Sequence, residues 1–391
     1  MMSIQIKYIC FSLLLFSHSV FGQSETACIV QKWETNHPGI ESISFVRTDS
    51  SSVSQSTVLE YADFVVLLEL PAVESAVRKE KNFKKETEAG NKFLTFIESY
   101  YRKPVRFVFV SHWHSHSISG VVPFLEKGVT FHITPYNWNE ALKDGTLPND
   151  SLQKVYSKQI VFIEKDTTLL AETDFPINVF CLDSLYERKP TKDYMIYYLP
   201  KAKTLHASCM AAVKEIDYDQ YEVIEYNDRL LDIRKVVQEK GLSVEHVIRL
   251  SFKKSPYYVI PYRDIEYMIR KGKSGGEMIA HFVSIDLNWL QSHQDSLLRY
   301  AVQTDLHPNL LRLAAYECLN QRNFDKALIF AKILCNYKPN QAFYVDVIGE
   351  CYYHKGEEEM AMYYDKLIKG MSDKYGIEQW KKRKIEKHVS F

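Results

Sequence analysis

The stretch VRFVFVSHWHSHSISG, which runs from Val105 to Gly120, decides the fold. It opens with an almost continuously apolar run, as in a strand of a sheet that is covered on both faces. This run leads directly into three histidines at alternate positions, His112, His114 and His116. The following segment, GVVPFLEKG, predicts a short helix that ends at Gly128. The segment VTFHITP then reads as another strand, so the histidine loop lies between a strand and a helix of an α/β unit.

The segments on both sides extend this α/β pattern. Upstream, TVLEYADFVVLLELP predicts two strands joined by a turn near Ala62 and Asp63, and EAGNKFLTFIESYY predicts a helix. Downstream, the segments QIVFIEK, INVFCL, YMIYYLP and EHVIRLSF predict strands, and two amphipathic helices end at Gly241 and Gly272. Ligand sites in such folds concentrate at the carboxyl ends of strands, where the histidines lie. The apolar residues expected on one face of the upstream helix are Phe93, Phe96, Ile97, Tyr100 and Tyr101.

The last hundred residues change character and predict a separate helical region. Five positions recur 34 residues further on, with small residues where two helices would cross: Leu311/Val345, Ala315/Gly349, Ala327/Ala361, Phe330/Tyr364 and Leu334/Ile368. This period resembles that of tetratricopeptide repeats, and the alternative is a generic pair of helical hairpins. Residues 284–301 are expected to supply a capping or divergent helix. We place the helical domain at residues 285–391 and the α/β domain at residues 23–275.

The first 22 residues read as a signal peptide, with Lys7 before the short apolar core YICFSLLLF. That core is too short to span a bilayer, and no other stretch predicts a membrane span in the mature chain. We therefore expect an exported protein, periplasmic or extracellular. The formal net charge of zero, from 49 basic and 49 acidic residues, argues against a nucleic-acid partner. Composition is that of an ordinary globular protein.

The segment SHWHSHSISG resembles the metal-binding motif T-H-x-H-x-D-H-x-G-G of the metallo-β-lactamase superfamily. The flanking segments STVLEYADFVVLLELPA and YMIYYLPKAKTLHAS are similar to strands of the same fold, so that the resemblance covers about Val53 to Lys271. It implies an αβ/βα sandwich. Family fold alone does not fix the reaction.

Several ligand positions depart from the family pattern. His112 and His114 match its first two histidines, but His116 stands where the family has aspartate, and Ser117 stands where it has the next histidine. Other positions also differ: Ser119 replaces the first glycine, Pro190 lies near the expected third histidine, Cys209 stands at the bridging aspartate, and Ser251 and Phe252 stand near the last histidine.

Three interpretations of the site follow. In the first, His112, His114 and His116 bind one Zn²⁺, with Cys209 as a further ligand, since imidazole and thiolate are good zinc ligands. In the second, His206 or Glu187 supplies a substitute ligand; in the third, the site is degenerate and holds no metal. His132 is expected to be a core residue and Glu69 to support the histidine loop or cap a turn.

The sequence thus predicts an exported metallo-β-lactamase-like protein with two functional alternatives. One is a metal-dependent hydrolase of a small-molecule substrate, with at most a mononuclear site. The other is a catalytically degenerate binding or scaffold protein that contacts a protein partner through its helical repeats. The sequence assigns no catalytic residue beyond the candidate metal ligands.

Overall fold

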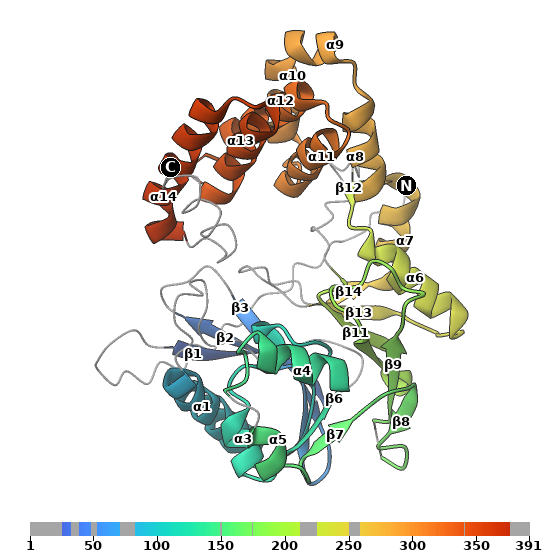
Figure 1. Ribbon diagram of the computed structural model, residues 1–391. Coiled ribbons are helices and arrows are strands. Elements are labelled where there is room, and N and C mark those ends of the chain that lie inside the picture. The colour runs from blue at the N-terminus through green and yellow to red at the C-terminus, as the bar shows by residue number, and fades with distance from the viewer. Residues whose placement is uncertain are drawn as a thin grey trace, which may run out of the picture.

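The computed structural model describes residues 26–32, 39–47, 53–70, 83–148, 151–173, 175–211, 225–249, 259–339 and 341–375. The candidate signal peptide and the positions Ser251 and Phe252 lie outside these ranges. Figure 1 shows two sheets with helices on their outer sides and a group of helices formed by the C-terminal part of the chain. The predicted α/β fold with a C-terminal all-α region is confirmed.

Among the described residues, the first sheet contains seven strands in sequence order, β1 to β7. The strands from β1 to β4 pair antiparallel, and those from β4 to β7 pair parallel. Their bounds are Thr26–Lys32 (β1), Ile40–Arg47 (β2), Val53–Glu60 (β3), Val65–Leu68 (β4), Val105–Phe109 (β5), Thr130–Ile133 (β6) and Ile160–Phe162 (β7).

In the part of the chain that the structure describes, the second sheet contains six strands in the order β14-β13-β11-β10-β9-β8, and a further two-stranded sheet pairs β12 with β15. Only β11 and β13 are parallel within the six-stranded sheet. The bounds are Thr167–Leu169 (β8), Ile177–Leu182 (β9), Tyr194–Leu199 (β10), Thr204–Ser208 (β11), Glu225–Tyr226 (β12), His246–Arg249 (β13), Val259–Pro261 (β14) and Lys273–Ser274 (β15).

The helices of the α/β part cover the outer face of each sheet (Figure 1). The first group is α1 (Phe83–Tyr101), α2 (Ser115–Ile118), α3 (Val122–Glu126), α4 (Pro135–Lys143) and α5 (Ser151–Val155). The second sheet carries α6 (Arg229–Glu239) and α7 (Tyr262–Lys271), and a 3-10 turn, Pro200–Ala202, joins β10 to β11.

Three apolar clusters hold these layers together. The first lies between the first sheet and its helices and contains Phe93 and Trp138; the second lies between the sheets and contains Phe109 and Tyr197. The third packs the second sheet against α6 and α7 around Ile265. The β10 strand is buried along its whole length, as expected for a strand covered on both faces. The layers therefore form the predicted αβ/βα sandwich.

One face of α1 is buried because its apolar residues recur at helical spacing. Phe93, Ile97 and Tyr101 recur every four residues and all three are buried against the first sheet. Tyr100 was expected on the same face but is 41% exposed. It stacks on Phe96 at 5.9 Å between ring centroids, at the rim of the buried stripe. The stripe is thus narrower than the sequence predicts.

A close glycine contact joins α1 to the turn that follows the histidine loop. A Cβ atom added at Gly90 would lie 2.3 Å from the carbonyl oxygen of Gly120. Gly120 itself has a φ of +74°, which favours glycine. Only two glycines allow the helix and this turn to approach so closely, and the contact fixes the far end of the histidine segment.

The C-terminal region contains α8 (Gly275–Ser284), α9 (Leu287–Ser292), α10 (Gln294–Gln303) and two further helix pairs. These pairs are α11 (Pro308–Asn320) with α12 (Phe324–Tyr337), and α13 (Ala342–Lys355) with α14 (Glu358–Tyr375), so that corresponding helices begin 34 residues apart. Residues 284–301, expected to supply a capping or divergent helix, contain α9 and most of α10. Ser284 ends α8, and Asp286 caps α9 by accepting a hydrogen bond from the backbone N–H of Trp289, so a new helix starts there.

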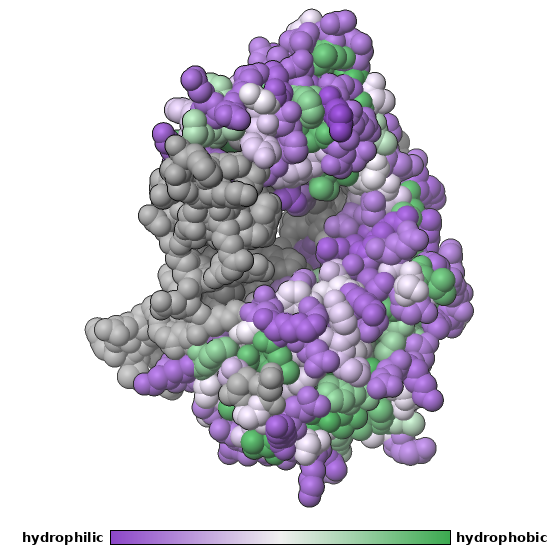
Figure 2. Space-filling model, in the orientation of Figure 1, coloured by the Kyte–Doolittle hydropathy of each residue, from purple (hydrophilic) through white to green (hydrophobic). Residues whose placement is uncertain are grey.

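In Figure 2 the visible face of the C-terminal helices is mostly hydrophilic, with scattered apolar side chains. Among the described residues, no helix combines the length and the apolar character needed to cross a membrane.

Candidate metal centre

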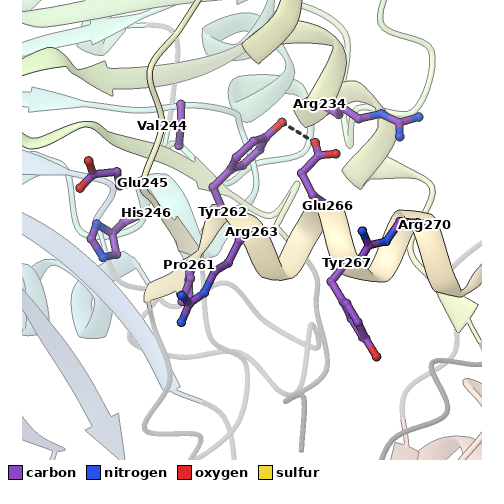
Figure 3. Close-up of a pocket in the computed structure, with 10 residues that line it drawn as sticks. All are labelled: Arg234, Val244, Glu245, His246, Pro261, Tyr262, Arg263, Glu266, Tyr267 and Arg270. Atoms are coloured by element: carbon purple, nitrogen blue, oxygen red, sulfur yellow. Dashed lines mark hydrogen bonds between the residues drawn. The ribbon is translucent and has the colours of Figure 1, made fainter. Parts of the chain in front are cut away.

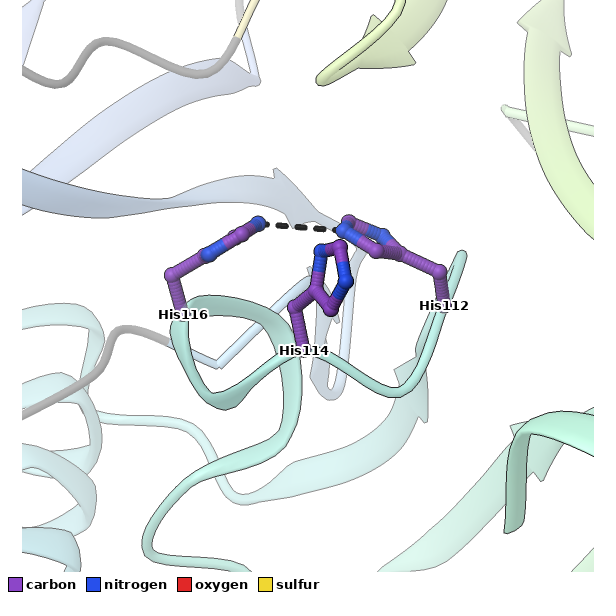
Figure 4. A group of neighbouring side chains, drawn as sticks. All are labelled: His112, His114 and His116. Carbon is purple, nitrogen blue, oxygen red and sulfur yellow. Dashed lines mark hydrogen bonds between the residues drawn. The ribbon is translucent and has the colours of Figure 1, made fainter. Parts of the chain in front are cut away.

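The three histidines of the loop between β5 and α3 point toward one another (Figure 4). One ligand nitrogen from each of His112, His114 and His116 lies within 4.8 Å of the other two. The Nε2 atoms of His112 and His116 are 3.0 Å apart. The loop reverses quickly because α2 forms a single turn after His114, and this turn brings His116 back over His112. The structure therefore groups the histidines that the sequence selects.

Cys209 contacts one member of this group from the second sheet, although its Sγ atom is not among the ligand atoms that lie within 4.8 Å of one another. Its Sγ atom lies 3.0 Å from Nε2 of His116, although 93 residues separate the two in sequence. The β11 strand ends in an irregular register after His206, and Ser208 has a φ of +47°. The backbone N–H of Cys209 then donates to the Tyr194 hydroxyl at 3.1 Å. This turn at the strand end directs the thiol toward the histidines.

Two serines fix the ring of His112, which is fully buried. The hydroxyls of Ser111 and Ser117 lie 2.7 Å and 3.3 Å from its Nδ1 atom. Because Nδ1 is occupied by these hydroxyls, Nε2 faces the other histidines. Ser117, which stands where the family has a histidine, thus orients a neighbouring ring in this chain.

Glu69 supports the histidine loop, which is one of the two roles expected for it from the sequence. Its side chain is fully buried, and its two carboxylate oxygens accept from the backbone N–H of Ser111 at 3.2 Å and 3.4 Å. It follows β4 directly and has a φ of +70°, an uncommon value for a residue with a side chain. Burial raises the pKa of Glu69 to about 8. The carboxyl group is therefore mostly protonated at neutral pH.

Asn137 is a second support that the sequence analysis did not identify. Its Oδ1 atom accepts from the backbone N–H of Trp113 at 3.2 Å, and its Nδ2 group donates to the carbonyl oxygen of Asp193 at 2.8 Å. It also donates to the Thr134 hydroxyl at 2.7 Å. One amide thus ties the histidine loop to the second sheet. In the sequence, Asn137 is recognisable only as an asparagine near the start of a helix, and such residues are common at helix starts.

The protonation states suit metal ligands. Burial and the neighbouring histidines lower the pKa of His112 well below its usual value, and burial lowers that of His116 to about 3. Both rings are therefore neutral at pH 7, as a metal ligand must be. Burial raises the pKa of Cys209 to about 12, so its thiol keeps its proton until a cation displaces it.

The spacing of the His112 and His116 nitrogens is close to that of a zinc site. With Zn–N bonds of about 2.1 Å, two nitrogens 3.0 Å apart would subtend an angle of about 90° at an ion, which is smaller than the tetrahedral value. Three imidazoles and a thiol are also the donor types that zinc prefers. The residues present therefore fit one such ion.

The other candidates lie apart from this group. His206 is buried on β11, with its ring 5.7 Å from that of Tyr197, and Glu187 is exposed; neither belongs to the group of converging ligand atoms. His132 is a core residue as expected and stacks on Phe109 at 4.5 Å. Its Nδ1 atom has no hydrogen-bond partner among the described residues.

A cavity of about 980 Å³ lies elsewhere, beside α6, α7 and the start of β13. Figure 3 shows that Arg234, Arg263 and Arg270 point in different directions around it, while the Tyr262 hydroxyl donates to Glu266 at 2.7 Å. Its lining contains none of the histidines at positions 112, 114 and 116. The arginines of this cavity therefore do not converge on one point, whereas the ligand atoms of the three histidines do.

No protein-family model matches the chain, and no curated protein matches its sequence. Solved structures with a similar chain arrangement include a metallo-β-lactamase from Pontibacter korlensis, with 15% identity, a TM-score of 0.44, and coverage of 62% of this chain and 98% of that one. The metallo-β-lactamase FIM-1 from Pseudomonas aeruginosa, in a mono-zinc form, has 13% identity, a TM-score of 0.41 and coverage of 60% and 91%. The metallo-β-lactamase from Hirschia baltica has 13% identity, a TM-score of 0.42 and coverage of 62% and 96%. Likeness at this level says nothing about which reaction, if any, the chain catalyses.

Proposed function

We propose that the chain is a metal-dependent hydrolase with a single ion held by His112, His114 and His116. The observation that carries this proposal is the convergence of the three ligand nitrogens within 4.8 Å, with the rings of His112 and His116 neutral at pH 7. Cys209 lies next to His116 and is the candidate for a fourth ligand. When bound, a zinc ion supplies Lewis-acid activation of a water molecule or a carbonyl or phosphoryl oxygen.

The chain's own residues divide the remaining work. Ser111 and Ser117 hold His112 with Nε2 toward the ion, and Glu69 and Asn137 hold the backbone of the loop. His114 and His116 are half-buried, so each ring keeps part of its surface accessible. A site of three histidines has a free coordination position, whereas a fourth protein ligand would close it. The position of Cys209 therefore decides between a catalytic and a structural ion.

A second ion is not supported by the residues. The family's additional ligands are replaced here, with His116 at the aspartate position and Ser117 at the next histidine. The Ser117 hydroxyl is already engaged with His112. The charge of a second cation would thus not be balanced by a carboxylate, and the hydrated cation in bulk water would be more stable than the bound one. We propose a stoichiometry of one ion per chain.

The alternative function is a binding module that acts through the helical region. Met360, Tyr363 and Leu367 are 37%, 58% and 41% exposed and recur on one face of α14. Such a face suits a protein partner, and the 34-residue spacing of the helix pairs supports tetratricopeptide-like repeats. We retain export to the periplasm or the extracellular space as part of both proposals, on the sequence of the first 22 residues.

Metal content separates the two functions. We expect one zinc ion per chain in the purified mature protein by elemental analysis, and none in the double variant His112→Ala with His114→Ala. The matched control replaces two other histidines of the helical region, His281→Ala with His293→Ala, and should keep the ion. A metal-free wild type would favour the binding module, and an unchanged double variant would place any ion elsewhere.

A further inference from the structure

The layer between the two sheets contains buried polar side chains with unpaired atoms. Gln55 and Thr57 lie on β3, Tyr197 on β10 and His206 on β11, and each of the four is at most 3% exposed. Among the described residues, no hydrogen bond reaches Gln55 Oε1, Thr57 Oγ1, the Tyr197 hydroxyl or His206 Nδ1. Most buried polar atoms in proteins bind either another protein group or an ordered water molecule. Four unpaired atoms in one layer therefore indicate a binding site.

The two residues on β3 face the second sheet. Gln55 and Thr57 share one face of the strand with Leu59, which belongs to the apolar cluster between the sheets. The Nε2 group of Gln55 crosses this layer and donates to the carbonyl oxygen of Arg249, at the end of β13, at 2.6 Å. The β3 strand thus lies opposite β13.

Tyr197 and His206 lie on the facing sheet, next to this contact. They pair in register on β10 and β11, and their ring centroids are 5.7 Å apart. The Tyr197 ring also meets Phe109 of β5 at 5.8 Å. Because β11 lies between β13 and β10, it occupies the position between these two points of contact. The strand that carries His206 therefore faces the part of the first sheet that carries Gln55 and Thr57.

The chemistry of the four unpaired atoms suits water rather than an ion. The Nε2 group of Gln55 is used by Arg249, so Oε1 can only accept, whereas the hydroxyls of Thr57 and Tyr197 both donate and accept. Burial lowers the pKa of His206 to about 3, so that its ring is neutral at pH 7. An ion among these neutral groups would be buried without a compensating charge, which is costly. A buried water molecule, in contrast, makes about three hydrogen bonds to groups of this kind.

We propose that this part of the sandwich binds ordered water molecules, held by Gln55, Thr57, Tyr197 and His206. The site lies behind the histidine loop, because His206 and Cys209 both belong to the end of β11 and the turn after it. The bound water would connect the two sheets through hydrogen bonds. None of the four residues belongs to the group of converging ligand atoms, so this inference does not depend on a bound metal.

The test counts long-lived internal water by ¹⁷O magnetic relaxation dispersion of the full-length mature protein in ¹⁷O-enriched water. Thr57→Val and Tyr197→Phe each remove a hydroxyl with little change in shape, and they are measured singly and together. Thr57→Ser keeps a hydroxyl at the same position. Thr204→Val is the matched control, because Thr204 is also buried on β11 but its hydroxyl donates to the carbonyl oxygen of Ala202 at 2.8 Å. Thermal unfolding of every variant is the second measurement.

We expect the double variant to lose the dispersion amplitude of about one water molecule per chain or more, while Thr57→Ser and Thr204→Val keep the wild-type amplitude. Neither Thr57→Val nor Tyr197→Phe should unfold at a higher temperature than wild type, since each removes a hydroxyl that binds water. A hydroxyl without any partner would give the opposite result, because an apolar group in its place removes the cost of burying it. An unchanged amplitude in the double variant, or a higher unfolding temperature in either single variant, overturns the inference. The single variants decide by both measurements if the double variant does not fold.

Discussion

The Sγ atom of Cys209 lies 3.0 Å from the Nε2 atom of His116, and this contact joins the two sheets of the sandwich at the histidine loop. Cys209 follows β11 of the second sheet, whereas His116 lies in α2 after β5 of the first. The contact therefore couples the proposed metal site to the relative position of the sheets. In that proposed site, the thiol decides whether an ion would keep an open position.

Replacing Cys209 by serine tests whether the thiol is a metal ligand. Serine keeps the size and polarity but is a much poorer zinc ligand, so we expect metal affinity to fall by about tenfold or more while one ion still binds at saturation. Competition with a chromophoric chelator measures the loss. Cys181→Ser, at a half-buried thiol on β9, is the control and should bind as wild type does. An unchanged affinity in Cys209→Ser would assign the site to the histidines alone.

Glu69→Gln tests the buried carboxyl group through the pH dependence of stability. Burial raises its pKa to about 8 from the usual 4.5, so the folded protein holds a proton that the unfolded chain releases above about pH 4.5. The protonated carboxyl group contributes its full stabilisation of the folded protein below about pH 4.5, and this stabilisation is lost as the pH rises through about 8. Relative to the glutamine variant, wild type should therefore lose up to about 5 kcal/mol over this range.

Urea unfolding of both metal-free proteins between pH 5 and pH 9 measures this difference. The variant keeps an amide oxygen that can accept from the Ser111 backbone N–H. A constant difference in unfolding free energy across the range would show that Glu69 is ionised in the folded protein.

Gly90→Ala tests the close contact behind the histidine loop. The new Cβ atom would lie 2.3 Å from the Gly120 carbonyl oxygen, so either α1 or the turn must move. We expect a loss of about 1–3 kcal/mol in unfolding free energy, as for other overpacked sites, with weaker metal binding because the turn follows the loop. Gly128→Ala is the control for glycine removal in open space, since nothing lies within 4 Å of its Cβ position. Its φ of +81° gives it a backbone cost of its own. Unaltered metal affinity in Gly90→Ala would show that the loop does not depend on this contact.

Gly349→Leu tests the packing of α13 on α14. A Cβ atom at this position would lie 3.3 Å from the Cβ atom of Tyr364, and the remaining atoms of leucine have no room without movement of the helices. We expect a destabilisation of about 2 kcal/mol of the helical region, seen in thermal unfolding. Metal content should stay at the wild-type value, because the site lies in the sandwich. An unchanged unfolding temperature would contradict the close helix contact.

The sequence predicts the order of elements well where local patterns are strong. The apolar run Val105–Val110 forms β5, which ends at Phe109, and the segments before and after it form the predicted strands and helices. The 34-residue recurrence also anticipates the spacing of α11 with α13 and of α12 with α14. At the edge of an apolar helix face, as at Tyr100, periodicity alone does not tell which side chains the sheet covers.

By itself, the sequence determined the α/β class, the position of the histidines at a strand end, and the helical C-terminal region. These follow from local periodicity and from turn-forming residues, which act over a few positions along the chain. Only the tertiary structure decided which distant groups gather at the histidine loop: Cys209 at His116, Glu69 at Ser111 and Asn137 at Trp113. Such contacts depend on the packing of two sheets whose residues lie tens of positions apart, and no local pattern specifies the register between them.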